Sequence, residues 1–243
     1  MRKLSFVLGV LVLIVCVAVP LPRFDSSMPF SAHMFRHTAL LLLAAPLLVV
    51  AIHPGKFASR NLAALSRVTA KFPYIAWLAG ILSMWAWHVP TLYNATEGLG
   101  TGILSCAPLS PALFPHTPSP HPAAMAALSI PWISARAITL VHDLSLLLAG
   151  FLFCWPVITP YSALRLPVLR AVLYLATACV CCSLLGLLIT FAPQGTYRGV
   201  GLEDQQTGGM IMWIPCCFVY LTASMVLLIR WLSRREPATQ ISM

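Results

Sequence analysis

The sequence predicts an all-α protein, a polytopic bundle of six transmembrane helices with both termini in the cytoplasm. Hydrophobic residues make up 59% of the 243-residue chain and charged residues only 9%, and the mean hydropathy is +0.87. A soluble domain carries about 25% charged residues, so this composition is typical of an integral membrane protein. The apolar residues also form long runs, and the basic residues gather on one side of them.

Each predicted helix is an apolar run close to the roughly 20 residues that cross the hydrocarbon layer. Backbone groups in lipid must pair within their own segment, which favours helices for runs of this length. The expected ranges are 4–20, 34–52, 74–90, 137–157, 168–191 and 209–232. The segments at 53–73 and 158–167 are expected to be cytoplasmic loops.

The distribution of charge sets the predicted orientation. With both termini inside, the inner ends and loops hold Arg2, Lys3, Lys56, Arg60, Arg67, Lys71, Arg165, Arg170, Arg230, Arg234 and Arg235. The outer side holds Arg23, Arg36, Arg136 and Arg198. This imbalance follows the positive-inside rule. The net charge of +9 is therefore explained by topology and contact with membrane lipid, and it gives no support to nucleic acid as a partner.

The first segment has two interpretations. Arg2 and Lys3 followed by an apolar run resemble a signal peptide, but no small-residue cleavage pattern follows and Pro20 is a poor neighbour for a cleavage point. We expect residues 1–20 to be retained as a first transmembrane helix or uncleaved signal-anchor. Either outcome leaves residue 30 outside.

The rest of the chain is expected to form one membrane domain over residues 21–232 and a cytoplasmic tail over 233–243. The domain carries a proline-rich outer loop at 91–136, which cannot be one continuous helix. His116 and His121 lie in its low-complexity part, and the sequence leaves their role open.

Four histidines stand at helix ends that the topology places on the outer side of the membrane: His33, His37, His88 and His142. Histidines that merely decorate helix ends would scatter between both faces. His33 and His37 also have a helical i, i+4 spacing, which puts both imidazoles on one face, close enough to share a metal. Imidazole suits Cu, Zn, Fe and Ni, so this layer is the predicted metal site, in the outer or periplasmic third of the cell (inner) membrane.

Four other residues are candidates for support of this layer or for docking of a partner: Asp143, Asp204, Met34 and Met210. Asp143 directly follows His142, but adjacent residues on a helix do not face each other, so a contact between His142 and a residue of another helix is equally open. Asp204 either stabilises the N-terminus of its own helix or faces the histidines. Gly208 and Gly209 allow close helix approach.

The cysteines concentrate in the last two predicted helices, at Cys179, Cys181, Cys182, Cys216 and Cys217. No CxxC pair is present, so a disulfide framework is not expected. Thiolates could form a Cu(I) chain, but small buried residues packing in a core are the preferred interpretation.

Four separated blocks, in order, resemble the CtaG family of cytochrome c oxidase assembly factors, in the group associated with caa-type oxidases. They are His33-Met34 with His37, leading to Ala45-Pro46-Leu47-Leu48; Trp87-His88-Val89-Pro90 with Leu92-Tyr93; His142 leading to Gly150-Phe151-Leu152-Phe153 and Trp155-Pro156; and Asp204-Gln205 with residues 208–215. The chain departs from the family pattern at Ile138 and Val141, ahead of His142, and in the proline-rich insert.

The resemblance implies a role in maturing a haem-copper oxidase, with its subunits as partners and copper delivered or inserted through the histidines. Other interpretations stay open: a membrane metal-binding or haem-binding protein, a copper transporter, and a structural partner of the oxidase without a metal. A transporter favours ionisable groups through the membrane interior, and none stands at mid-depth. No nucleophile–base pair stands out, so an enzyme is not expected.

Overall fold

The computed structural model describes residues 2–18, 28–53, 60–94 and 135–234, and the elements within these ranges are helices. The all-α prediction is thus confirmed for the described chain. The elements are α1 (Arg2–Ala18), α3 (Pro29–Ala39), η1 (Leu40–Ala44), α4 (Ala45–Ala51), α5 (Arg60–Lys71), α6 (Pro73–His88), α9 (Ala135–Ile158), η3 (Ser162–Leu164), α10 (Val168–Phe191) and α11 (Leu202–Leu232).

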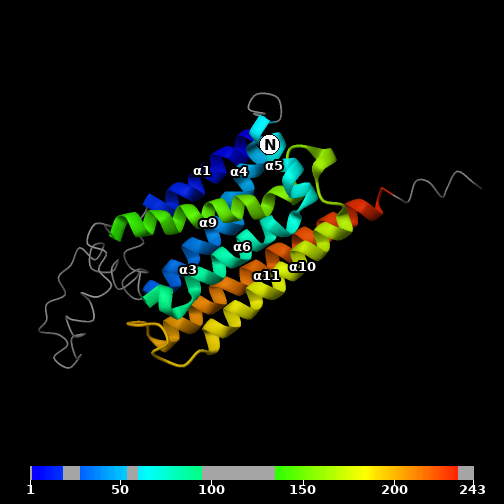
Figure 1. Ribbon diagram of the computed structural model, residues 1–243. Coiled ribbons are helices and arrows are strands. Elements are labelled where there is room, and N and C mark those ends of the chain that lie inside the picture. Colours follow the sequence, from blue (N-terminus) through cyan, green and yellow to red (C-terminus); the bar gives the residue numbers. More distant parts are fainter. Residues whose placement is uncertain (1, 19–27, 54–59, 95–134, 235–243) are drawn as a thin grey trace, which may run out of the picture.

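The long helices lie side by side in one elongated bundle (Figure 1). Within the described residues, four helices are long and apolar enough to cross a membrane, at Pro29–Ala51, Leu140–Ile158, Val168–Phe191 and Leu202–Leu232. Two others, α1 and α6, have 17 and 16 residues, which is short of the usual length. The structure therefore supports a membrane protein, while six spans with both termini inside stay a prediction.

The span Pro29–Ala51 is continuous, with a π-helical turn, η1, between α3 and α4. Pro46 follows the turn and lacks a backbone N–H, so the regular ladder of hydrogen bonds cannot pass through this point. A wider turn accommodates the proline, and such π-turns often lie near functional sites. Here the turn begins three residues after His37.

Two helix boundaries differ from the sequence-based ranges. The second span begins at Pro29 rather than at residue 34, and α11 begins at Leu202 rather than at residue 209. The segment 202–208 carries Glu203, Asp204 and two glutamines, and the segment 29–33 includes Pro29, Ser31 and His33, so neither belongs to the strongly apolar runs. The two segments pack against each other: a Cβ at Gly208 would lie 2.4 Å from Phe30, so the missing side chain permits this close approach, as the sequence predicted.

The expected loop at 53–73 is wrong in part, because it contains the helix α5. Its buried positions, Ser66 and Thr69, are polar, so a search for apolar periodicity misses them. Ser66 Oγ donates to the Leu62 carbonyl at 2.9 Å and lies 3.0 Å from Thr159 Oγ1. Trp155 Nε1 donates to the same Ser66 oxygen at 2.9 Å. These bonds fix α5 to the end of α9.

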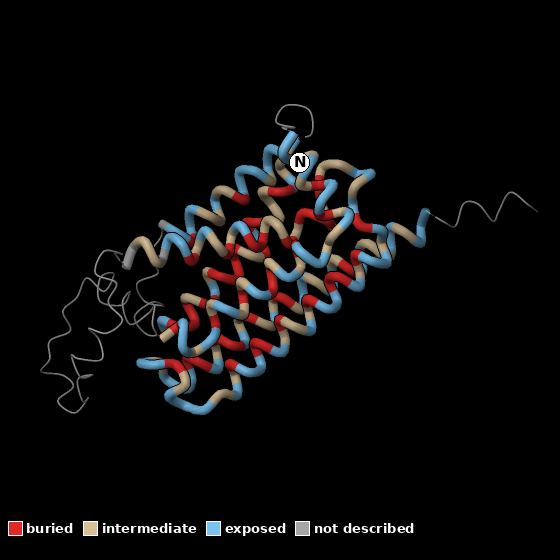
Figure 2. Tube along the Cα trace, viewed as in Figure 1, coloured by how far each residue is buried: buried red, intermediate tan, exposed pale blue. Residues whose placement is uncertain are grey.

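Buried residues run along the inside of the bundle, and the outer helix faces are exposed (Figure 2). The exposed side chains include large apolar ones such as Leu148, Leu173 and Phe218, as expected for faces in contact with lipid. The start of α3, the end of α6 and the start of α9 lie at the same end of the bundle (Figure 1). That end holds the histidines.

Candidate metal centre

The four predicted histidines come together from three helices. Ring centroids are 3.9 Å apart for His33 and His37, 4.3 Å for His37 and His142, and 5.3 Å for His37 and His88. One nitrogen from each of His33, His37 and His142 lies within 4.8 Å of the others. The four histidines that topology assigned to one layer are therefore in contact. His33, His37 and His142 form one group, and His88 contacts it through His37.

Hydrogen bonds fix which nitrogen of His88 carries its proton. His88 Nδ1 bonds to the Met84 carbonyl, and because a carbonyl only accepts, Nδ1 is protonated and Nε2 has a lone pair. That Nε2 lies 3.4 Å from His37 Nδ1, so His37 Nδ1 is the donor. His37 Nε2 is then left with a lone pair. This nitrogen is buried and has no hydrogen-bond partner in the part of the chain that the structure describes.

The same reasoning applies to His142. Its Nδ1 lies 2.9 Å from Asp143 Oδ1. The carboxylate can only accept a hydrogen bond, so Nδ1 carries the imidazole proton. The side chains of these neighbours do meet, so the expectation that they would not face each other is wrong. His142 Nε2 is buried, and no described residue forms a hydrogen bond with it. A carboxylate that orients an imidazole through its other nitrogen is the usual support of a metal-binding histidine.

The cluster has the donor set of a three-histidine ion site. Metal–imidazole bonds of about 2.0 Å place the three nitrogens of a trigonal site about 3.4 Å apart. Since the nitrogens lie within 4.8 Å here, the rings need to close inward by about 1 Å. The two buried lone pairs without partners have a cost of roughly 1–3 kcal/mol each, which a bound cation would remove.

Asp204 positions the first two histidines. Its carboxylate accepts hydrogen bonds from the backbone N–H groups of Phe30 and Ser31, at 2.9 and 2.8 Å, and Ser31 Oγ donates to its carbonyl at 3.1 Å. Asp204 lies in the first turn of α11, as predicted, but its side chain caps the N-terminus of α3. His33 follows less than one turn later, so the cap fixes the end of the helix that carries the histidines.

Three further residues that sequence reasoning missed hold the other two histidines. Tyr197 Oη donates to the His88 carbonyl at 2.9 Å, and burial raises the pKa of Tyr197 to about 12, so it remains a donor at neutral pH. Trp87 packs edge-on against the His142 ring, with the ring centroids 4.6 Å apart. Its Nε1 donates to Ser145 Oγ at 2.8 Å, and Ser145 Oγ donates to the His142 carbonyl at 2.7 Å.

The two candidate methionines have different positions. Met34 is fully buried, and its Sδ lies 3.1 Å from His88 Nε2. Met210 is 41% exposed and lies away from the buried face of α11, which carries Asp204, Gln205, Gly208 and Met212. The structure therefore brings Met34 to the cluster and leaves Met210 at the surface. His116 and His121 lie outside the described residues.

The chain was also compared with known proteins. The sequence model of one family, the cytochrome c oxidase caa3 assembly factors, matches residues 1–100 and 123–234. The gap in the match falls in the proline-rich insert, where the sequence departs from the family pattern. No curated protein and no solved structure shows significant similarity to the chain. Because the match covers most of the chain and includes all four histidines of the cluster, the chain belongs to the cytochrome c oxidase caa3 assembly factor family.

Proposed function

We propose that this assembly factor carries copper for a haem-copper oxidase, bound between His33, His37 and His142. His88 is not a ligand in this proposal, because its Nε2 accepts a hydrogen bond from His37 Nδ1–H. This bond leaves the lone pair of His37 Nε2 free for the ion. The observation that supports the proposal best is the pair of buried Nε2 lone pairs, on His37 and His142, that have no partner within the described protein. One nitrogen of each of these residues also lies within 4.8 Å of the other and of one nitrogen of His33.

Several features favour copper as the cargo. Imidazole binds copper, zinc, iron and nickel alike, so the histidines alone do not select among them. The thioether of Met34, next to the cluster through His88, is a soft group that suits Cu(I). The family's oxidase partner needs copper for its own centres. Three neutral ligands, one of them only partly buried, suit an ion that must be released again.

The proposed side of the membrane is the outer one, with oxidase subunits docking at that face. This rests on the positive-inside distribution of lysine and arginine and on the position of the cluster at one end of the bundle (Figure 1). In this arrangement the protein binds and transfers an ion without catalysing a reaction.

The test measures copper binding by the purified full-length protein under reducing conditions, with a colorimetric Cu(I) chelator as competitor. Changing His33, His37 and His142 together to alanine is expected to remove one bound Cu(I) per chain. His53→Ala is the matched control, because His53 is exposed at the far end of the same span. Equal binding by the triple variant and the wild type would rule out the histidine site.

A second measurement separates copper delivery from a scaffold role. The oxidase is purified from cells that produce only the triple variant, and its copper and haem are quantified. We expect haem at the normal level and copper lost. Normal copper would indicate that the histidines serve another purpose.

The haem alternative is less well supported than a single ion. Rings with centroids 3.9 and 4.3 Å apart are in van der Waals contact, and a porphyrin needs a slot between its two ligands. A Soret band on the purified protein would reverse this preference. The transporter alternative requires groups that can bind the ion deeper in the membrane.

A further inference from the structure

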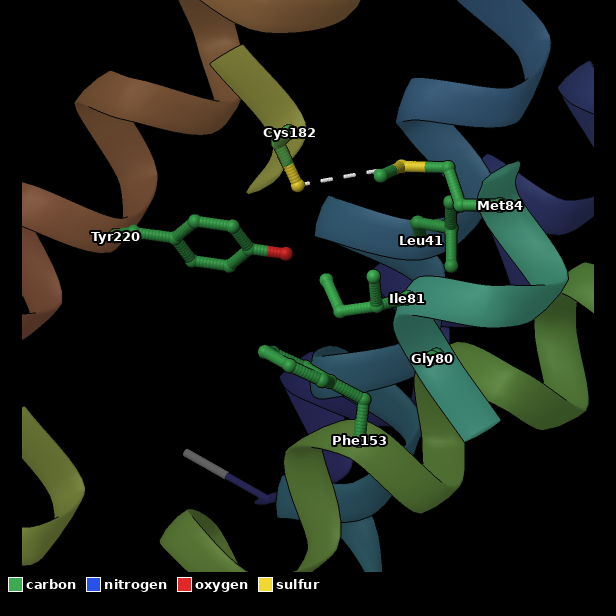
Figure 3. A pocket seen from close by; sticks show the side chains of 8 residues that line it. Leu41, Gly80, Ile81, Met84, Phe153, Cys182 and Tyr220 are labelled. Atoms are coloured by element: carbon green, nitrogen blue, oxygen red, sulfur yellow. Dashed lines mark hydrogen bonds between the residues drawn. The ribbon is translucent and has the colours of Figure 1, made fainter. Parts of the chain in front are cut away.

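A charged surface at one end of the bundle offers more to a ligand than the small cavity in its interior. Figure 3 shows that cavity, which Met84, Phe153, Cys182 and Tyr220 help to line. Its volume of about 20 Å³ is enough for one water molecule, and most of its lining is apolar. The charged surface belongs to α5, which lies at the opposite end of the bundle from the histidines (Figure 1).

The cations of α5 form one stripe along the helix, here called the basic stripe: Arg60, Arg67 and Lys71, all of them exposed. With 3.6 residues per turn, these three positions fall within about 40° of one another around the helix axis. The buried residues of α5, Ser66 and Thr69, lie on the other side of the helix, where Ser66 is bonded to the end of α9. The basic stripe therefore points away from the bundle.

No acidic residue balances this charge within the described ranges of the chain. The carboxylates in those ranges are Asp143, Glu203 and Asp204, and all three belong to the end of the bundle that holds the histidines. Arg67 and Lys71 are also one turn apart, and like charges at this spacing destabilise a helix. An anion bound from outside removes this repulsion.

A fourth cation lies beside the basic stripe. Arg165 is exposed and directly follows η3, which packs against α5. Its Nε donates to the Thr159 carbonyl at 2.8 Å, and Thr159 Oγ1 lies 3.0 Å from Ser66 Oγ of α5. The polar contacts that anchor α5 therefore also position Arg165. This bond uses one of the five N–H donors of the guanidinium.

The position of α5 places these cations at the level of a membrane surface. The helix follows the candidate span Pro29–Ala51, and its Ser66 contacts Thr159, directly after the candidate span Leu140–Ile158. The aromatic residues Phe72 and Tyr74 come next in the chain, with Tyr74 57% exposed. Exposed aromatic side chains of this kind are typical of the depth of lipid headgroups.

We propose that the basic stripe, together with Arg165, binds the phosphate headgroups of anionic phospholipids. Guanidinium groups bind phosphate oxygens through paired N–H donors, and basic residues at the membrane surface attract anionic lipid. Val68, next to the stripe, is 50% exposed and suits contact with the upper part of an acyl chain. Depth and this apolar neighbour favour a lipid over an acidic segment of a protein. Lipid binding fixes this end of the bundle at the membrane surface and leaves the histidine end to a partner.

The test titrates the full-length protein in detergent with phosphatidylglycerol or with phosphatidylcholine of the same acyl chains, and native mass spectrometry counts the bound lipids. Each Lys or Arg near an anionic surface strengthens binding about fivefold, so we expect a preference for phosphatidylglycerol of at least that size. High salt should reduce it. The double variant Arg60→Gln with Arg67→Gln should lose most of the preference and stay folded, because both side chains are exposed.

The charge-matched control is Arg230→Gln with Arg234→Gln. These two exposed arginines lie in the last turn of α11 and just after it, so their loss changes the net charge equally and should leave the preference intact. The proposal is overturned if the wild type binds both lipids alike, or if the two double variants lose the preference equally. Displacement of phosphatidylglycerol by an equimolar poly-glutamate peptide would also overturn it, in favour of an acidic protein partner. Copper takes no part in these measurements, so their outcome is independent of the histidine site.

Discussion

Two buried polar clusters lie at opposite ends of α9, and they differ in how their hydrogen bonds are satisfied. At the end of α9, Ser66 Oγ donates to the Leu62 carbonyl and is contacted by Trp155 Nε1 and Thr159 Oγ1. A hydroxyl has one proton and two lone pairs, so this oxygen is complete. At the start of α9, His37 Nε2 and His142 Nε2 have no hydrogen-bond partner among the described residues.

The difference separates a structural cluster from a candidate site. Buried polar groups in folded proteins are nearly always hydrogen-bonded, and exceptions call for an explanation. The Ser66 cluster joins α5 to α9 and needs no ligand to be complete. The nitrogens without partners in the histidine cluster are expected to lower the stability of the protein, as is common where function and stability compete.

The largest effect on stability is expected at the Ser66 cluster, whose hydrogen bonds are all satisfied. Trp155 is fully buried, so Trp155→Ala leaves a cavity and removes the donor to Ser66, lowering the free energy of unfolding by about 3–5 kcal/mol. Copper bound per folded chain should not change. Denaturant titration in mixed micelles measures the first quantity and chelator competition the second.

Trp155→Phe is the matched control for that experiment, since it keeps most of the ring and loses only the Nε1 donor. We expect a smaller loss, of about 1–2 kcal/mol. If Trp155→Ala instead removed copper binding from folded protein, the separation of the two clusters would be incorrect.

The contrast between the clusters also shows what the sequence can predict. Long apolar runs predicted α10 closely, and the positions of His33, His37, His88 and His142 at helix ends predicted that they would meet. Apolar run length is enough for the first conclusion. The second followed from the expected alternation of span directions, since consecutive spans cross a membrane in opposite directions.

The supports of the cluster were out of reach of sequence reasoning. Asp204 is far from Phe30 and Ser31 in the chain, and only the packing of α11 against α3 makes it a cap for that helix. The hydrogen bond of Tyr197 to the His88 carbonyl likewise involves a backbone atom that has no sequence signature. The buried residues of α5 are the polar Ser66 and Thr69. The sequence of this helix therefore has no apolar periodicity to detect.

An intermediate effect on stability is expected at Asp204, which supports the histidine cluster. Asp204→Ala leaves the N–H groups of Phe30 and Ser31 buried without acceptors, so the free energy of unfolding should fall by about 1–3 kcal/mol. Because the start of α3 then loosens around His33 and His37, copper affinity should fall as well. Isothermal binding measurements and denaturant titration report the two effects.

Glu203→Ala is the control for Asp204→Ala. Glu203 is an exposed neighbour in the same first turn of α11, so it shares the charge and the helix but not the bonds to α3. We expect both stability and copper affinity to remain near the wild-type values. An equal loss of affinity in both variants would attribute the effect to charge near the cluster rather than to the cap.

The smallest effect on stability is expected where the effect on function is largest. His37→Leu replaces a buried ring that has one unsatisfied nitrogen by an apolar side chain, and such a change is often neutral or stabilising. The lost bond to His88 offsets part of the gain, so the free energy of unfolding should stay within about 1 kcal/mol of the wild type. Copper binding at the histidines should be lost. A variant that binds no ion yet unfolds no more easily is the result that a binding site predicts and a structural cluster does not.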